Sequence, residues 1–171
     1  MVTNRLQLLN FYVKMQSNSY LLVVFVMNKI CTFAGHGDYS YSEITYQKII
    51  SCIKQLICEK NISEFWVGNY GSFDDLAAKA LREVKEIYTH IRLCLVIPYM
   101  TSRVNKHLFD KIIIPEFDKN ASVYSYIPLC NRYMVDNSHT LICFIKRETG
   151  GAFKTYQHAL KKNKEIINIA D

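Results

Sequence analysis

The chain is poor in the features that mark disordered, repetitive or membrane-spanning proteins. It holds only three prolines among 171 residues. It has no tract of low complexity and no internal repeat, which excludes a disordered or fibrous protein. Its longest apolar run, residues 20–26, is too short to span a bilayer, so no membrane partner is expected. Half of the residues are hydrophobic and 21% are charged. A chain of this length has enough material for one domain with a full core.

Cysteine pairs with the spacing of a metal site are also missing. The six cysteines stand at positions 31, 52, 58, 94, 130 and 143, and none forms a close pair. Three of them fall inside apolar runs, where a free cysteine behaves as a small hydrophobe. We therefore expect a reduced, cytoplasmic protein with no metal site and no disulfide framework.

Acidic residues are absent from the first 26 positions, which contain Arg5 and Lys14. Lys14 precedes the apolar run as in a signal peptide, but no small-residue cleavage site follows. Met27 stands directly before the first strand-like segment. We expect residues 1–26 to be an N-terminal extension, either dispensable and the product of a mis-called start, or an extra element packed on the domain. Residues 27–171 then form a single domain.

The rest of the chain alternates short apolar runs with segments of helical periodicity. Helices are expected from a cap at Ser42 to about residue 59, from a cap at Ser72 to residue 88, and at 121–135 and 151–163. Strands are expected at 30–34, 64–67, 92–97, 111–114, 140–145 and 166–169. This order predicts an α/β protein: a three-layer, doubly wound fold with a mainly parallel sheet of about six strands.

Three glycine-bearing turns follow predicted strands, and they carry the functional signal. They are Gly35-His36-Gly37, Gly68-Asn69-Tyr70-Gly71 and Gly150-Gly151. Because the carboxyl ends of parallel strands meet at one edge of a sheet, we expect the turns to gather near the topological switch point. Glycine allows close approach to a ligand, and a helix N-terminus favours an anion. The alternative is that the glycines only close tight corners.

Several side chains near these turns have both a binding and a structural interpretation. Arg132 could contact a phosphate in bidentate fashion, or form a surface salt bridge. His36 could bond a ribose or phosphate, or point into solvent. Asp74 could accept a hydrogen bond from a sugar hydroxyl or base amine, or simply stabilise the first turn of its helix. Thr155 could touch phosphate, or cap locally.

Four segments, 33–37, 65–74, 131–138 and 150–155, together resemble the SLOG superfamily. This Rossmann-like group holds YpsA-like proteins, LOG-type nucleoside-monophosphate phosphoribohydrolases and DNA-processing protein A. The similarity is greatest to its small YpsA-related bacterial members. It implies a nucleotide or nucleotide derivative as ligand and no other cofactor. The residues expected to bind it are Gly35, His36, Gly37, Gly68, Asn69, Gly71, Ser72, Asp74, Arg132, Gly150, Gly151, Lys154 and Thr155.

The chain departs from the hydrolase pattern at the position of the catalytic acid. LOG-type enzymes carry a glutamate soon after their Gly-Gly turn, where this chain has Tyr156-Gln157-His158. Glu148 could replace that acid, with Arg132 as the second catalytic group. Three hypotheses follow: a nucleotide-binding module that senses or sequesters its ligand, a phosphoribohydrolase that cleaves the N-glycosidic bond, and a DNA-binding protein. The modest net charge of +6 disfavours nucleic acid. Whether the protein is an enzyme and whether it forms a homo-oligomer stay open.

Overall fold

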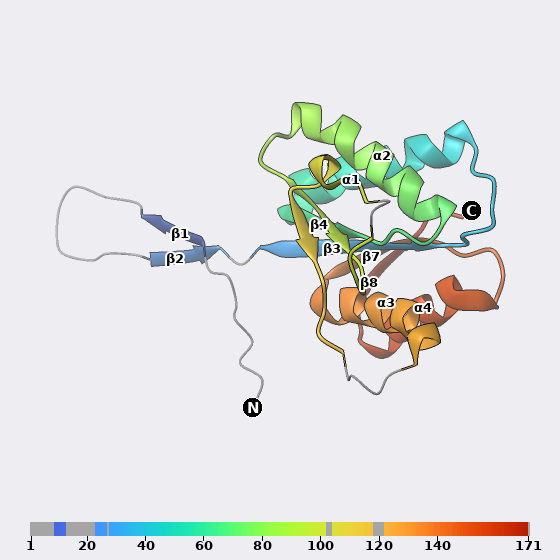
Figure 1. Cartoon of the computed structure of the whole chain (residues 1–171). Helices are drawn as coiled ribbons and strands as arrows, with labels where there is room; N and C mark the ends of the chain where they lie inside the picture. The colour runs from blue at the N-terminus through green and yellow to red at the C-terminus, as the bar shows by residue number, and fades with distance from the viewer. Residues whose placement is uncertain (1–8, 13–22, 27, 102–103, 118–121, 171) are drawn as a thin grey trace, which may run out of the picture.

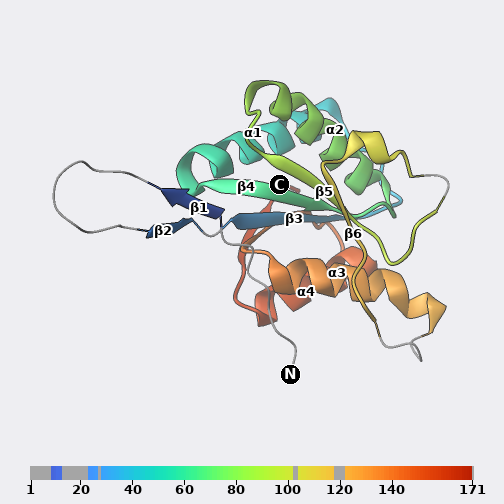
Figure 2. The ribbon, with the colours of Figure 1, turned by 60° about the vertical axis from the view of Figure 1, so that its left-hand side comes forward.

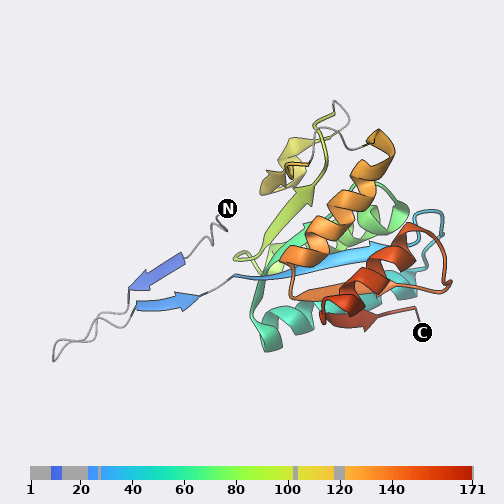
Figure 3. The ribbon, with the colours of Figure 1, turned by 90° about the horizontal axis from the view of Figure 1, so that it is seen from below.

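The computed structural model describes residues 9–12, 23–26, 28–101, 104–117 and 122–170. Six strands form one sheet in the order β6-β5-β4-β3-β7-β8, and every neighbouring pair is parallel (Figure 3). The predicted parallel sheet of six strands is therefore confirmed. The strands are β3 (Lys29–Gly35), β4 (Ile62–Val67), β5 (Arg92–Val96), β6 (Lys111–Ile113), β7 (Thr140–Phe144) and β8 (Glu165–Asn168).

Two pairs of helices cover the two faces of the sheet, as Figures 1 and 2 show. Helices α1 (Glu43–Lys60) and α2 (Ser72–Ile87) pack on one face. Helices α3 (Tyr126–Asn137) and α4 (Gly150–Lys161) pack on the other. This is the predicted three-layer, doubly wound arrangement of a Rossmann-like fold. Two short 3-10 turns, η1 (Lys106–Leu108) and η2 (Val123–Ser125), lie in the connections on either side of β6.

The core explains why the central strands read as continuous apolar runs. All five residues of β7 are buried, as are the last four of β5. A strand covered by helices on both faces has no solvent-facing side, so polar and apolar residues do not alternate along it. The larger core lies between the sheet and α1 and α2, and includes the fully buried Phe33, Phe65 and Leu81.

Helix starts are where the structure agrees least with the sequence-based expectation. Ser42 caps α1 as predicted, because its Oγ accepts a hydrogen bond from the Thr45 N–H at 3.2 Å. Ser72 does not cap α2: the cap residue is Gly71, and Ser72 is the first helical residue. Helix α3 begins at Tyr126 rather than near 121, which places Pro128 in the first turn, where its missing N–H is tolerated.

Strands β1 (Leu9–Tyr12) and β2 (Val23–Val26) pair with each other in an antiparallel two-stranded sheet. They pair with no strand of the six-stranded sheet, and Figure 1 shows them projecting to one side of it. The treatment of residues 1–26 as an extension stays a prediction, and much of that segment lies outside the described residues. Among the described helices, none has the length and apolar character needed to cross a bilayer.

Candidate functional site

The three glycine turns meet at the carboxyl edge of the sheet, as expected. Strand β3 lies between β4 and β7, so the chain crosses over to opposite sides of β3, and the switch point lies between β3 and β7. The turns after β3, β4 and β7 all leave the sheet at this edge. All six glycines of the chain lie in these three turns.

The first two turns are packed against each other. A Cβ on Gly71 would lie 2.7 Å from the Cα of Gly37, and a Cβ on Gly35 would lie 2.2 Å from the ring of Phe73. The Ser72 hydroxyl donates to the carbonyl oxygens of Gly37 and, at 2.8 Å, Tyr39. Glycine is therefore needed at these positions because other parts of the protein occupy the space that a side chain would take.

Asp74 closes the start of helix α2. Its Oδ2 accepts a hydrogen bond from the Tyr70 N–H at 3.0 Å, and lies 2.8 Å from where a Cβ on Gly68 would stand. A third helical residue that reaches back to a preceding backbone N–H satisfies a donor that the helix itself leaves unpaired. Burial raises the pKa of Asp74 to about 6, with a smaller contribution from Asp75, while the backbone donors oppose the rise.

Asp74 also lines a cleft of about 180 Å³ on the α2 side of this edge. Asn69, Asp75, Arg82 and Asn105 supply further polar groups to the cleft. The described residues contain no group of three histidines, cysteines or acids placed to hold a metal ion.

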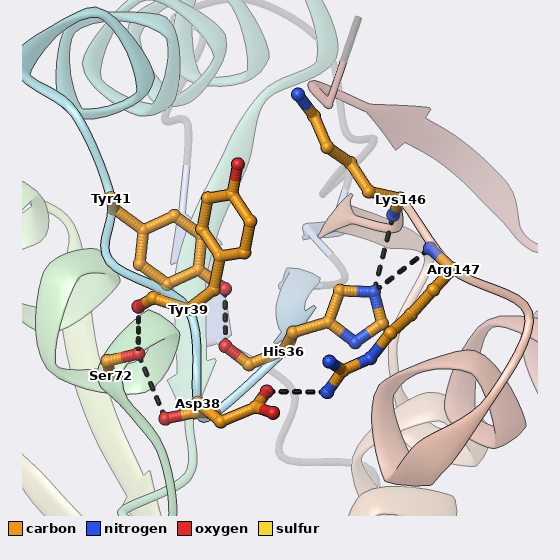
Figure 4. Close-up of polar contacts among 8 residues, drawn as sticks. His36, Asp38, Tyr39, Tyr41, Ser72, Lys146 and Arg147 are labelled. Carbon is orange, nitrogen blue, oxygen red and sulfur yellow. Dashed lines mark hydrogen bonds and ion pairs between the residues drawn. The ribbon is translucent and has the colours of Figure 1, made fainter.

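His36 ties the first turn to the third. The side chain is buried, and its Nε2 accepts hydrogen bonds from the backbone N–H groups of Lys146 at 3.3 Å and Arg147 at 3.4 Å (Figure 4). Its own carbonyl accepts from the Tyr41 hydroxyl at 2.6 Å. An accepting Nε2 requires a neutral ring with its proton on Nδ1. Burial, reinforced by the Arg147 charge, lowers the pKa of His36 and favours that neutral form.

An ion pair and an aromatic cluster that the sequence-based site did not include reinforce this connection. The Arg147 guanidinium lies 2.5 Å from Asp38 Oδ1 on the exposed side of the turn, and this hydrogen bond lowers the pKa of Asp38 (Figure 4). Beneath it, the Tyr41 ring lies 5.2 Å from the Tyr39 ring and 4.9 Å from the Phe144 ring. Tyr39 and Tyr41 stand two and four positions after Gly37, and this spacing was the sequence signal that could have revealed the aromatic cluster.

The third turn differs from the other two because its helix start is open. Gly150 has a φ of +86°, which an L side chain rarely adopts, and apart from chain neighbours and the helix's own backbone no described atom lies within 4 Å of a Cβ built at Gly150 or Gly151. Thr149 stands at the cap position, yet its side chain makes no capping hydrogen bond within the described chain. No acidic residue stands in the first turn of α4. Among the described residues, therefore, no capping side chain pairs with the first backbone N–H groups of α4.

The remaining predicted site residues are distributed around this start. Thr155 is buried, and its hydroxyl donates to the Gly151 carbonyl at 2.9 Å, so it serves its own helix. Lys154, Arg132 and Glu148 are exposed, the last two on α3 and in the loop before α4. Neither Arg132 nor Glu148 forms an ion pair with a described residue. Their catalytic roles stay predictions.

No protein-family model and no curated protein matches this chain. Solved structures do match it. DNA processing protein A (DprA) from Streptococcus pneumoniae superposes with a TM-score of 0.58 at 15% identity, covering 81% of this chain and 49% of that one. The DprA from Helicobacter pylori, whose structure concerns single-stranded DNA binding, superposes with a TM-score of 0.58 at 14% identity. That match covers 81% of this chain and 63% of the H. pylori chain. This chain thus spans about half the length of the S. pneumoniae protein.

A third similar structure is the molybdenum cofactor carrier protein of Chlamydomonas reinhardtii. It gives a TM-score of 0.56 at 15% identity and covers 84% of this chain and 77% of that one. At such low identities the similarity establishes the fold and leaves activity to the residues of the site. These matches agree with the predicted Rossmann-like fold, and the resemblance of the glycine turns to the SLOG superfamily stays a prediction from the sequence.

Proposed function

We propose that the protein binds a nucleotide or nucleotide derivative at the carboxyl edge of its sheet, with the phosphate at the start of helix α4, and that it senses or sequesters this ligand. The observation that carries the proposal is the open helix start at Gly150 and Gly151, where the backbone donors lack a side-chain cap and the first helical turn holds no acidic residue. Backbone N–H groups and the helix dipole together favour a phosphate at such a position.

The charge around the open start is consistent with an anionic ligand. Lys146 and Lys154 are exposed on either side of the glycine pair, and Arg147 is held beside them by Asp38 and by the contact of its backbone with His36. Two proteins of similar fold are a carrier of the molybdenum cofactor and a DNA processing protein studied with single-stranded DNA. Both neighbours are described by a ligand that they carry or bind, which supports a ligand-binding role for this protein.

A charge placed at the cap position tests the proposal without disturbing the fold. In Thr149→Asp, the new carboxylate caps α4 and occupies the place of the phosphate. We expect it to weaken nucleoside monophosphate binding about 10-fold or more by calorimetry, without lowering the melting temperature. Thr149→Asn separates charge from capping: its amide caps the same N–H groups without adding charge, so it should weaken binding less than Thr149→Asp does. If wild type binds none of the common nucleotides, the proposal is wrong.

Single-stranded DNA is a second candidate ligand, and one observation favours it. The two DNA processing proteins share this fold, and exposed tyrosines lie at the same edge of the sheet. Bases of any sequence stack on exposed aromatic rings, while basic side chains contact the phosphates. A mobility shift of an oligo-dT strand at low salt, lost as salt rises, would support this candidate; unchanged mobility at low salt would remove it.

A further inference from the structure

Four aromatic side chains gather at the carboxyl edge on the α3 side, and we call them the aromatic surface: Tyr70, Tyr99, Phe117 and Tyr126. They come from different connections: the turn after β4, the loop after β5, the segment after β6 and the first residue of α3. The Phe117 and Tyr126 rings are stacked, with centroids 6.0 Å apart and planes 19° apart. Tyr99 meets Tyr126 edge to face at 6.4 Å.

The aromatic surface is exposed although three of its members, Tyr99, Phe117 and Tyr126, contact one another. Tyr70 is 38% and Tyr99 is 49% exposed, and the other two are half-buried. Single exposed aromatic residues are ordinary, whereas a contiguous group that stays exposed marks a binding surface. Burial raises the pKa of Tyr70 to about 12, with smaller contributions from Cys130, Tyr99 and Asp74. Tyr70 also belongs to the second glycine turn, so the surface continues directly from the candidate site.

We propose that the aromatic surface stacks the planar base of the nucleotide whose phosphate lies at the start of α4. This inference rests on the proposed function and specifies which part of the ligand meets which part of the edge. Helices α3 and α4 pack against each other, and both begin at the carboxyl edge (Figure 3). The aromatic surface and the phosphate donors are therefore at the same end of one helical layer. Tyrosine suits this role because its flat ring stacks while its hydroxyl reaches the polar rim of a base.

The ligand class that follows is a nucleotide with an intact base, in preference to a sugar phosphate. Ribose 5-phosphate presents the same phosphate to α4 but nothing for the aromatic surface to stack upon. We therefore expect wild type to bind at least one of AMP, GMP, CMP and UMP more tightly than ribose 5-phosphate, by about 10-fold.

Substitutions in the aromatic surface separate stacking from phosphate binding. Tyr99→Ser and Tyr70→Ser remove exposed rings, and each should weaken binding of the preferred monophosphate about 10-fold while leaving ribose 5-phosphate binding unchanged. Tyr99→Phe keeps the ring and should bind as the wild type does. Tyr124→Ser is the matched control. Tyr124 is 94% exposed, lies between Phe117 and Tyr126 in the chain and makes no ring contact with a described residue. Its loss should leave the binding of both ligands unchanged.

The outcomes separate this inference from the proposed function. If Tyr99→Ser and Tyr70→Ser bind the monophosphate as tightly as wild type while Thr149→Asp does not, the aromatic surface is not the base site but the phosphate site stands. If wild type binds neither monophosphate nor ribose 5-phosphate, both proposals fail. If only an oligo-dT strand binds, and Tyr99→Ser abolishes that binding, the surface stacks single-stranded DNA and the mononucleotide inference is overturned.

Discussion

The starts of helices α2 and α4 are alike in sequence and opposite in structure. Each follows a strand and a turn with two glycines, and each stands at the carboxyl edge. At α2 protein groups close the turn, because Gly71 contacts Gly37 and Asp74 accepts the Tyr70 N–H, and the cleft of about 180 Å³ lies beside this closed start. At α4 no described atom lies near the positions where Gly150 and Gly151 would carry side chains. We therefore expect a ligand at the start of α4 rather than at the start of α2.

The largest expected effect is a loss of stability when a side chain is added at the start of α2. In Gly71→Ala the new Cβ would lie 2.7 Å from the Cα of Gly37, and backbone cannot move aside as a flexible side chain does. We expect the free energy of unfolding to fall by about 3 kcal/mol in urea titrations. Gly151→Ala meets no described atom and should stay within about 0.5 kcal/mol of wild type. Equal losses in both variants would contradict the distinction.

The next effect concerns the connection between the first and third turns. His36→Ala removes the acceptor for the N–H groups of Lys146 and Arg147, so we expect a loss of about 2 kcal/mol. The lowered pKa of His36 means that the folded chain binds fewer protons than the unfolded chain at pH values below about 6.5. The stability from His36 is therefore present above the unfolded pKa and lost as pH falls through the folded one. In urea titrations, the difference in free energy of unfolding between wild type and His36→Ala should become smaller as the pH falls from 7 to 5.

Asp74 should show the opposite dependence on pH. Its folded pKa of about 6 lies above the ordinary value of 3.8, so the folded chain binds more protons between these values. The contribution of Asp74 to stability is then largest at low pH and is lost as pH rises through about 6. Asp74→Asn keeps an acceptor for the Tyr70 N–H but cannot ionise. As the pH rises from 4 to 7, its free energy of unfolding should therefore increase by about 1 kcal/mol relative to that of the wild type. A constant difference across this range would show that the carboxyl group does not titrate there.

The smallest expected effect on stability is at the open start and has the opposite sign. Thr149→Asp and Thr149→Asn supply the side-chain cap that α4 lacks among the described residues, so each should raise the free energy of unfolding by about 0.5 kcal/mol. Placing asparagine at the already closed α2 start, in Gly71→Asn, should instead destabilise as Gly71→Ala does. A loss of stability in Thr149→Asn would indicate that the cap position is not vacant.

The fold could be predicted from the sequence because its signals are local. The apolar runs of β4, β5 and β7 are buried on both sides, and Ser42 caps α1 through a residue only three positions away. The site could be predicted only in outline. Ser72 bonds a residue 35 positions earlier, and His36 accepts from residues 110 and 111 positions later. Which glycines are enclosed and which are open depends on such distant neighbours, which no local pattern reveals.

The most direct test of the central claim is an amide NMR titration of the labelled protein with the preferred nucleoside monophosphate. We expect large shifts for the amides of Gly151, Ala152 and Phe153 at the start of α4. We expect smaller shifts for the amides of Ser72 to Asp74 at the start of α2, where protein groups close the turn and only the neighbouring Tyr70 ring meets the base. Shifts concentrated at the start of α2, with the α4 amides unmoved, would contradict the claim.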